Sequence, residues 1–178
     1  EIGEQEEYIR SEEERGQTAV IVGNLEEIWG VISIADTLRK DSKELIASLK
    51  KLGVEKIIML TGDNKRVAKA IGDELGIDDY YGELLPEDKV SVLQELRKKY
   101  GLTAMVGDGV NDAPALAAAD LGIAIGGSGT DVAMETADVV LLSAELKKLS
   151  HAIGISRATV RNMKQNIYFA LLVAGTLL

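Results

Sequence analysis

Residues 104–119 contain the densest set of side chains in this chain that could do chemistry. A short apolar run ends in Gly107-Asp108-Gly109, and Asn111 and Asp112 follow before a helix that Pro114 opens. Carboxylates placed after a strand suit Mg²⁺, which proteins hold with one or two carboxylates together with water and substrate phosphate. In an open α/β sheet, the loops at the carboxyl ends of the strands bind ligands. The alternative is an Asx-rich turn before a helix, because Gly, Asp and Asn are common turn residues.

A second loop, Thr61-Gly62-Asp63-Asn64, follows the apolar run 56–60. The sequence predicts a helix over 65–75 after it, which stops at Gly76. Thr61 offers a hydroxyl, Gly62 allows close approach to the backbone, and the helix start supplies N–H groups and a positive dipole end. Together these groups make an anion site. The alternative is a plain connection in which Asp63 or Asn64 caps the helix.

A third segment, Pro86-Glu87-Asp88-Lys89, begins a predicted helix over 86–100. Pro86 suits the first helical position, and Glu87 and Asp88 interact favourably with the helix N-terminus. Lys89 opposes the helix dipole unless an anion offsets its charge. The alternative is a solvated surface lysine.

Three strings, MLTGDN at 59–64, PEDK at 86–89 and GDGVNDAPAL at 107–116, resemble the phosphorylation domain of P-type cation-transporting ATPases, a branch of the haloacid dehalogenase-like superfamily. A ten-residue string such as the last has little chance of arising by accident. Asp36-Thr37-Leu38-Arg39 is similar to the family's hinge segment, and residues 128–138 resemble the stretch after its metal loop. ADTLR and MKQN favour the heavy-metal-transporting subgroup.

The resemblance implies a role for each residue of the metal loop. Asp108 matches the family's Mg²⁺-coordinating Asp. Asp112, with Asn111, completes the loop around the metal and the phosphate of ATP, the substrate.

The resemblance also implies roles in the other two segments. Thr61 matches the hydroxyl that bonds the phosphoryl oxygens, next to Gly62. Asp63 matches the acid beside it, near the nucleotide and the hinge. Lys89 matches the lysine that neutralises charge around the phosphorylated Asp. Phosphoryl transfer depends on positioning and charge neutralisation, so a metal, a lysine and a hydroxyl form a sensible set.

One departure concerns the nucleophile. The family's Asp-Lys-Thr-Gly-Thr motif, whose Asp becomes the aspartyl-phosphate, is absent from these 178 residues, and Asp36-Thr37 lacks the Lys-Thr-Gly part. The only histidine, His151, is followed by Ala152, so the subgroup's His-Pro motif is absent too, and His151 is expected to be a surface or packing residue. We therefore expect a fragment that begins in the tail of the nucleotide-binding domain and does not hydrolyse ATP alone.

Composition narrows the class of protein. The hydrophobic content of 46% is enough for a core, and the net charge of −9, without a basic patch, argues against nucleic acid as a partner. The chain has no cysteine, which excludes disulfides and thiolate metal sites within it. Its Glu-rich start is not a signal peptide.

Short apolar strands alternating with helices predict an α/β fold, and the resemblance makes it a haloacid dehalogenase-like doubly wound parallel sheet that is incomplete. Residues 1–17, with seven Glu, are expected to be a solvated helix or a frayed end. A hairpin is predicted over 18–34, and Asp41 is expected to cap a helix that reaches Leu52. The predicted strands are 56–60, 80–82, 103–106, 121–125 and 138–142, with a further helix over 112–119. The loop from Gly126 to Gly129 is interpreted as a turn first and a phosphate contact second.

The C-terminal stretch resembles the start of a membrane helix. Apolar residues recur at helical spacing in residues 146–167. The second half of this stretch contains the basic residues Arg157, Arg161 and Lys164, and residues 167–178 carry no charge. Twelve residues do not span a bilayer, which needs roughly 20. A basic collar before an apolar run is typical of a transmembrane helix, here expected to be truncated. The alternative is a C-terminal helix buried in the core.

The predicted organisation has three parts: residues 1–34 end the nucleotide-binding domain, residues 35–150 belong to the phosphorylation domain, and residues 151–178 form a stalk and membrane helix. The expected protein is part of a multi-pass membrane pump for a heavy-metal cation. Its partners are the rest of that pump (nucleophile strand, actuator domain and membrane helices), the transported cation and the lipid membrane. The alternatives are a soluble phosphatase of the same superfamily and a non-catalytic nucleotide-sensing module.

Overall fold

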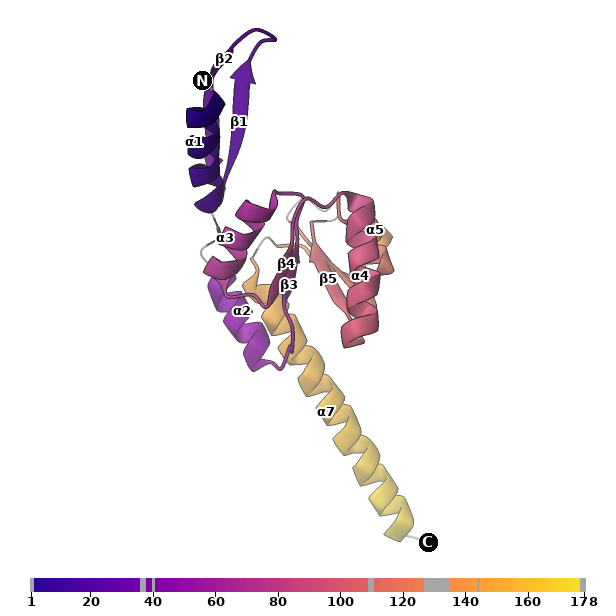
Figure 1. Cartoon of the computed structure of the whole chain (residues 1–178). Helices are drawn as coiled ribbons and strands as arrows, with labels where there is room; N and C mark the ends of the chain where they lie inside the picture. The colour runs from indigo at the N-terminus through magenta and orange to yellow at the C-terminus, as the bar shows by residue number, and fades with distance from the viewer. Residues whose placement is uncertain are drawn as a thin grey trace.

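The computed structural model describes residues 2–35, 38–39, 41–108, 111–126, 135–143 and 145–176. Figure 1 shows an N-terminal helix and hairpin, a central α/β body, and a long C-terminal helix that extends away from the body. The elements in chain order are α1 (Ile2–Glu14), β1 (Gln17–Gly23), β2 (Ile28–Ala35), α2 (Ser42–Lys51), β3 (Ile58–Leu60), α3 (Lys65–Leu75), β4 (Asp79–Tyr81), α4 (Pro86–Tyr100), β5 (Ala104–Gly107), α5 (Ala113–Ala118), β6 (Leu121–Ile125), β7 (Val139–Leu141) and α7 (Lys147–Thr176).

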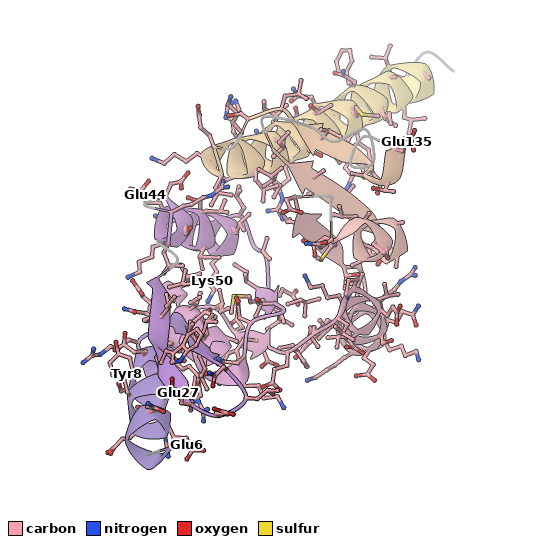
Figure 2. All side chains as sticks on the ribbon, turned by 90° about the horizontal axis from the view of Figure 1, so that it is seen from above. Glu6, Tyr8, Glu27, Glu44, Lys50 and Glu135 are labelled. Carbon is pink, nitrogen blue, oxygen red and sulfur yellow. The ribbon has the colours of Figure 1, made fainter. Side chains whose placement is uncertain are left out.

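The predicted hairpin is confirmed: β1 and β2 pair antiparallel, with Gln17 opposite Ala35. Asn24 closes the turn, because its Oδ1 accepts the N–H groups of Glu26 and Glu27 at 2.8 and 2.7 Å. Helix α1 lies beside this hairpin at one end of the molecule, where Figure 2 labels Glu6, Tyr8 and Glu27.

The expectation that residues 1–17 are entirely solvated or frayed is wrong in part. Glu12 and Glu13, near the end of α1, are buried. Glu12 accepts a hydrogen bond from Ser33 Oγ of β2 at 2.9 Å and pairs with Arg15, also at 2.9 Å. These contacts supply the polar partners that a buried carboxylate requires.

The parallel α/β fold is confirmed, and the sheet is divided. Strand β3 pairs with β4, and β5, β6 and β7 pair in that order, all parallel. Among the described residues, no strand hydrogen-bonds β3 to β5. The incomplete sheet predicted from the sequence therefore consists of a two-stranded and a three-stranded part.

Helices cover both faces of β6. Ile123 and Ile125 face one way and pack in a cluster with Leu45 and Leu49 of α2 and Leu149 of α7. Ala124, between them, belongs to a second cluster with Leu93 of α4, Met105 of β5, and Ala115 and Leu116 of α5. Because neighbouring residues of a strand point to opposite faces, β6 is buried on both sides, as in a doubly wound sheet.

Three aspartates set the start of the parallel strands in the same way. Asp78, just before β4, accepts the N–H of Ile57, which precedes β3, at 2.9 Å. Asp120, just before β6, accepts the N–H of Thr103 at 2.9 Å and also pairs with Arg97. Asp138, just before β7, accepts the N–H of Gly122 at 2.8 Å, so each carboxylate satisfies a backbone donor of the preceding strand.

The helix ends agree with the sequence except at α2. Helix α3 ends at Gly76, which has a left-handed backbone, and α4 begins at Pro86 and ends before Gly101. Asp41 precedes α2, but its side chain makes no capping hydrogen bond. Glu44, three residues after Asp41, pairs with Lys147 of α7 at 2.8 Å.

Helix α7 packs on the body only at its beginning. Leu149 is buried and Ile153 is partly buried beside it, whereas Ile167, Phe169 and Leu172 are each more than half exposed. The alternative of a C-terminal helix buried in the core is therefore wrong for its second half. Within the described residues, no helix has the length and apolar character needed to cross a membrane.

The carboxylate of Asp78 gives a pH-dependent prediction. The hydrogen bond from Ile57 lowers the pKa of Asp78, and Lys50 and Lys56 add to this. The stabilisation is complete above the unfolded-state pKa of about 4 and is lost as the pH falls through the lower folded-state value. Asp78→Asn keeps an acceptor for Ile57 but does not titrate. In urea titrations between pH 7 and pH 3, the variant should therefore lose less unfolding free energy than the parent; equal losses would contradict this.

The exposed half of α7 gives a second prediction. A row of exposed apolar side chains favours self-association in water. A chain ending at Lys164 should sediment as a monomer at concentrations at which the 178-residue chain forms larger species. Equal association of the two chains would contradict a role for residues 165–176 in it.

Candidate functional site

Lys89 and Asp112 join two of the predicted segments. Lys89 lies in the first turn of α4, and its Nζ is 2.7 Å from Asp112 Oδ1 in the metal loop. The two side chains are 12% and 17% exposed, so the pair is mostly shielded from water. The Asp112 carboxylate offsets the positive charge of Lys89, which the dipole of α4 disfavours. The alternative of a solvated surface lysine is therefore wrong.

The predicted metal loop begins where β5 ends. Asp108 directly follows Gly107 and is exposed, as is Asn111. The side chain of Asp112 folds over Gly107, because a Cβ at Gly107 would lie 2.5 Å from Asp112 Oδ2. The absence of a side chain at Gly107 therefore allows Asp112 to reach Lys89.

Thr61 and Asp63 hold one another in the second loop. The Thr61 hydroxyl donates to Asp63 Oδ2 at 2.7 Å, and the N–H of Asp63 donates back to Thr61 Oγ1 at 3.1 Å. Gly62 and Asp63 are exposed, and Thr61 is half-buried. This closed turn fixes the hydroxyl and the carboxylate side by side at the carboxyl end of β3.

Asn64 is the cap of α3, which decides between the two capping candidates. Its Oδ1 accepts the N–H groups of Arg66 and Val67 at 3.0 and 2.9 Å. Two of the N–H groups that the sequence assigned to an anion site are therefore already satisfied. Asp63 has no part in the cap and stays in the turn with Thr61.

The connection from β4 to α4, which the sequence analysis did not identify, links the two segments. The N–H of Glu83 donates to Asp63 O, and that of Leu84 to Thr61 O at 3.1 Å. Gly82 permits this approach, because a Cβ there would lie 2.9 Å from Asp63 O. The chain then enters α4, where Asp88 accepts the N–H of Leu85 at 3.0 Å, and reaches Lys89.

The ends of β3 and β5 also share a core. Leu60, the residue before Thr61, packs against the cluster that contains Met105 of β5 and Leu116 of α5. A continuous set of contacts therefore runs from Thr61 through residues 82–85 to Lys89 and then to Asp112. The structure brings the three sequence-predicted segments together around the break between the two parts of the sheet.

The donor set of this site suits a hard cation with few protein ligands. Asp108 and Asp112 supply carboxylate oxygens, and Mg²⁺ commonly takes only one or two carboxylates and completes its shell with water and phosphate. Over the part of the chain that the structure describes, no three His, Cys, Asp or Glu side chains are grouped to hold a metal ion. The residues present therefore fit Mg²⁺ better than a closed site for a transition metal.

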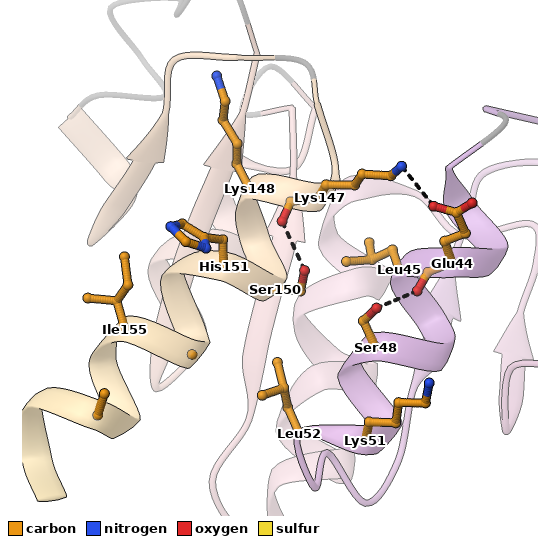
Figure 3. A pocket seen from close by; sticks show the side chains of 12 residues that line it. Glu44, Leu45, Ser48, Lys51, Leu52, Lys147, Lys148, Ser150, His151 and Ile155 are labelled. Carbon is orange, nitrogen blue, oxygen red and sulfur yellow. Dashed lines mark hydrogen bonds and ion pairs between the residues drawn. The ribbon is translucent and has the colours of Figure 1, made fainter.

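A groove of about 850 Å³ lies elsewhere, between α2 and α7 (Figure 3). Its lining includes Leu52 and Ile155, and His151 faces it from the surface of α7, as expected for a surface residue. Lys147 is paired at its edge with Glu44, which raises the pKa of the lysine. None of the predicted site residues lines this groove.

Some predicted segments lie outside the described residues. These are Asp36 and Thr37 of the hinge, Gly109 in the metal loop, and residues 127–134, which include most of the glycine-rich loop.

Comparisons with known proteins give one family. A model of the haloacid dehalogenase-like hydrolases matches residues 2–120. A probable cadmium-transporting ATPase of Alkalihalophilus pseudofirmus is 50% identical over 168 residues, which cover 94% of this chain and 23% of that protein. The copper-exporting P-type ATPase B of Archaeoglobus fulgidus is 49% identical over 93% of this chain and 24% of its own length.

A solved structure is similar in the same way. The crystal structure of a zinc-transporting PIB-type ATPase in its E2.Pi state superposes with a TM-score of 0.77 and 48% identity, covering 93% of this chain and 27% of that one. The chain thus spans about a quarter of the length of the relatives it matches.

The packing of Asp112 on Gly107 gives a prediction. A methyl group at Gly107 must displace the Asp112 side chain, and overpacking of this kind costs about 1–3 kcal/mol. Gly107→Ala should therefore lower the unfolding free energy by that amount in urea titrations. Gly30→Ala, in strand β2, is the matched control, because a Cβ there meets no atom within 4 Å. Equal effects of the two changes would contradict the argument.

Proposed function

The chain belongs to the haloacid dehalogenase-like hydrolase family and is homologous to a segment of heavy-metal-transporting P-type ATPases; from this we propose that it is the phosphoryl-transfer segment of such a pump. The whole pump would couple hydrolysis of ATP, through an aspartyl-phosphate, to movement of a heavy-metal cation across a membrane. The homology does not favour a soluble phosphatase or a nucleotide-sensing module.

The observation that carries the proposal is the Lys89–Asp112 pair. The 2.7 Å contact joins the start of α4 to the loop after β5 and places a shielded cation beside the carboxylate of Asp112. A transferring phosphoryl group needs this combination, because its charge is stabilised by fixed positive groups that require no reorganisation.

Each site residue takes a distinct part. Asp108 and Asp112 would hold Mg²⁺, which when bound supplies positive charge to the phosphoryl oxygens. The Thr61 hydroxyl, which donates its single proton to Asp63 in this structure, would turn that proton toward the phosphoryl oxygens, and Lys89 would neutralise charge around them. Gly62, Asp63 and Asn111 would line the nucleotide and phosphate side of the site.

The nucleophile must come from another segment, since the Asp-Lys-Thr-Gly-Thr motif is not in this sequence. The break in the sheet supports a position for it. Among the described residues, the edge of β3 away from β4 and the edge of β5 away from β6 carry no strand. A strand between them would pair with both edges and present its carboxyl end between Thr61 and Asp108.

Other surfaces fit the rest of a pump. The hairpin exposes Val20, Trp29 and Ile32, as a hairpin would if it belonged to a larger nucleotide-binding domain. The second half of α7 is apolar and follows Arg157, Arg161 and Lys164, which suits entry into the cytoplasmic side of a membrane. We therefore propose domain boundaries at residues 34 and 150, which separate these two surfaces from the α/β body.

The proposal is tested in the full-length protein. Asp108→Asn removes one negative charge from the Mg²⁺ ligand and should reduce the rate of phosphoenzyme formation from ATP by about 100-fold or more, the usual effect of losing a charge-stabilising group. It should also raise the Mg²⁺ concentration needed for half-maximal phosphorylation.

The matched control is Asp73→Asn, an exposed carboxylate of α3 that pairs with Lys69 outside the site. It should leave both measurements unchanged. An Asp108→Asn protein that is phosphorylated as fast as the parent, with the same Mg²⁺ dependence, would contradict the assignment.

A further inference from the structure

The C-terminal end of helix α1 contacts the start of α3, next to the loop that carries Thr61 (Figure 1). Glu13, near the C-terminal end of α1, lies 51 residues before Asn64 of that loop in the sequence. Its Oε1 accepts the side-chain N–H of Asn64 at 2.7 Å, and its Oε2 accepts Arg66 Nε at 2.6 Å. The Glu13 side chain is only 11% exposed, whereas that of Arg66 is 54% exposed, so the carboxylate is the shielded partner.

The chemistry of Asn64 makes this contact directional. An amide has a single oxygen, and here that oxygen accepts the N–H groups of Arg66 and Val67. The amide nitrogen must then face an acceptor, which the carboxylate of Glu13 supplies on its own because it is acceptor-only. Glu13 thus fixes the orientation of the α3 cap, one residue after the Asp63 that holds the Thr61 hydroxyl.

Two further contacts join α1 to the hairpin and place this α1–hairpin unit against α3. Glu12 ties α1 to β2 through Ser33. The backbone at Gly16, between α1 and β1, lies against α3, since a Cβ there would be 3.7 Å from Ala70 and 3.8 Å from Ile71. Displacement of the hairpin would therefore act on Glu13 and through it on Asn64.

We infer that Glu13 is a positioning residue that couples the placement of the α1–hairpin unit to the phosphate loop 61–64. This inference rests on the proposed function, in which the α1–hairpin unit belongs to the part that brings ATP and the loop receives its phosphoryl group. The Thr61–Asp63 turn is closed by its own hydrogen bonds, and engagement of Glu13 by Asn64 and Arg66 sets where the unit that carries the nucleotide lies relative to that turn.

The coupling predicts different effects on two routes to the same phosphoenzyme. Phosphorylation from ATP requires the nucleotide-bearing part to be placed on the loop. Phosphorylation from inorganic phosphate with Mg²⁺ uses the same Thr61, Lys89 and Asp108 but no nucleotide. Both are measured in the full-length protein.

Glu13→Gln is nearly isosteric but replaces one acceptor oxygen by an NH₂ donor, which faces either Arg66 or the Asn64 amide. We expect the rate of phosphorylation from ATP to fall about tenfold, the order expected for loss of one charge-assisted hydrogen bond. The extent of phosphorylation from inorganic phosphate should stay within about twofold of the parent. This reaction uses no nucleotide, so it does not require the α1–hairpin unit to be placed on the loop.

Glu12→Gln is the matched control. Glu12 is the neighbouring buried carboxylate, its hydrogen bonds stay within the α1–hairpin unit, and a Gln keeps an acceptor oxygen for Ser33, so both reactions should be retained. Arg66→Gln should reproduce the selective loss, and the Glu13→Gln/Arg66→Gln double variant should lose less than the product of the two single effects, because both remove the same interaction.

The outcomes separate the possibilities. Equal loss of both reactions in Glu13→Gln would make Glu13 a structural residue and overturn the coupling, as would unchanged phosphorylation from ATP. A parent protein that forms no phosphoenzyme by either route would instead overturn the proposed function.

Discussion

The structure depends on the burial of β6 on both faces. Ile123 and Ile125 attach α2 and the start of α7 on one side, and Ala124 attaches α4, α5 and β5 on the other. A strand buried in this way has no solvent to satisfy its backbone, so its hydrogen bonds must come from neighbouring strands and from fixed side chains. Asp120 and Asp138 meet this need by accepting N–H groups where β5 and β6 begin. Each contact thereby fixes the position of one strand along its neighbour. Since Asp108 directly follows β5, its place is a consequence of this packing.

The site is built between the two parts of the sheet by the connection after β4. Glu83 and Leu84 donate backbone hydrogen bonds to the Thr61 loop, and the same chain then turns into α4 and carries Lys89 to Asp112. Glu83 adopts a positive φ of 61°, which is uncommon for a residue with a side chain, and Gly82 is packed too tightly to carry one. This short connection therefore holds the two loops in place relative to each other, as continuous strand pairing would in an uninterrupted sheet.

Much of this arrangement was predictable from the sequence because it rests on local signals. Gly76, Pro86 and Gly101 mark helix ends through their own backbone preferences, and the apolar runs locate every strand to within about two residues. The parts that were missed depend on partners distant in sequence. Asp120 accepts from a residue 17 positions earlier, and Glu13 contacts residues 51 and 53 positions later. In a helix with so many glutamates, nothing local distinguishes the buried Glu12 and Glu13 from solvated neighbours. Asp41 is a similar case. Its sequence context suits a helix cap, but its side chain makes no capping hydrogen bond, and the nearby Glu44 pairs with the distant Lys147.

The charges of the site residues are unbalanced, which bears on the proposed phosphoryl transfer. Asp63, Asp108 and Asp112 contribute three carboxylates to the loops, and Lys89 is bound directly to one of them. These four groups carry more negative than positive charge, and a phosphoryl group adds further negative charge. Like charges that lie close together repel, and a nearby cation relieves the repulsion. In the proposed function, a divalent cation held by Asp108 would offset this excess of negative charge, which Lys89 alone would not, because Asp112 already pairs with it. In the proposed function, the pairing that positions Lys89 therefore leaves the metal to supply the positive charge that a phosphoryl group needs.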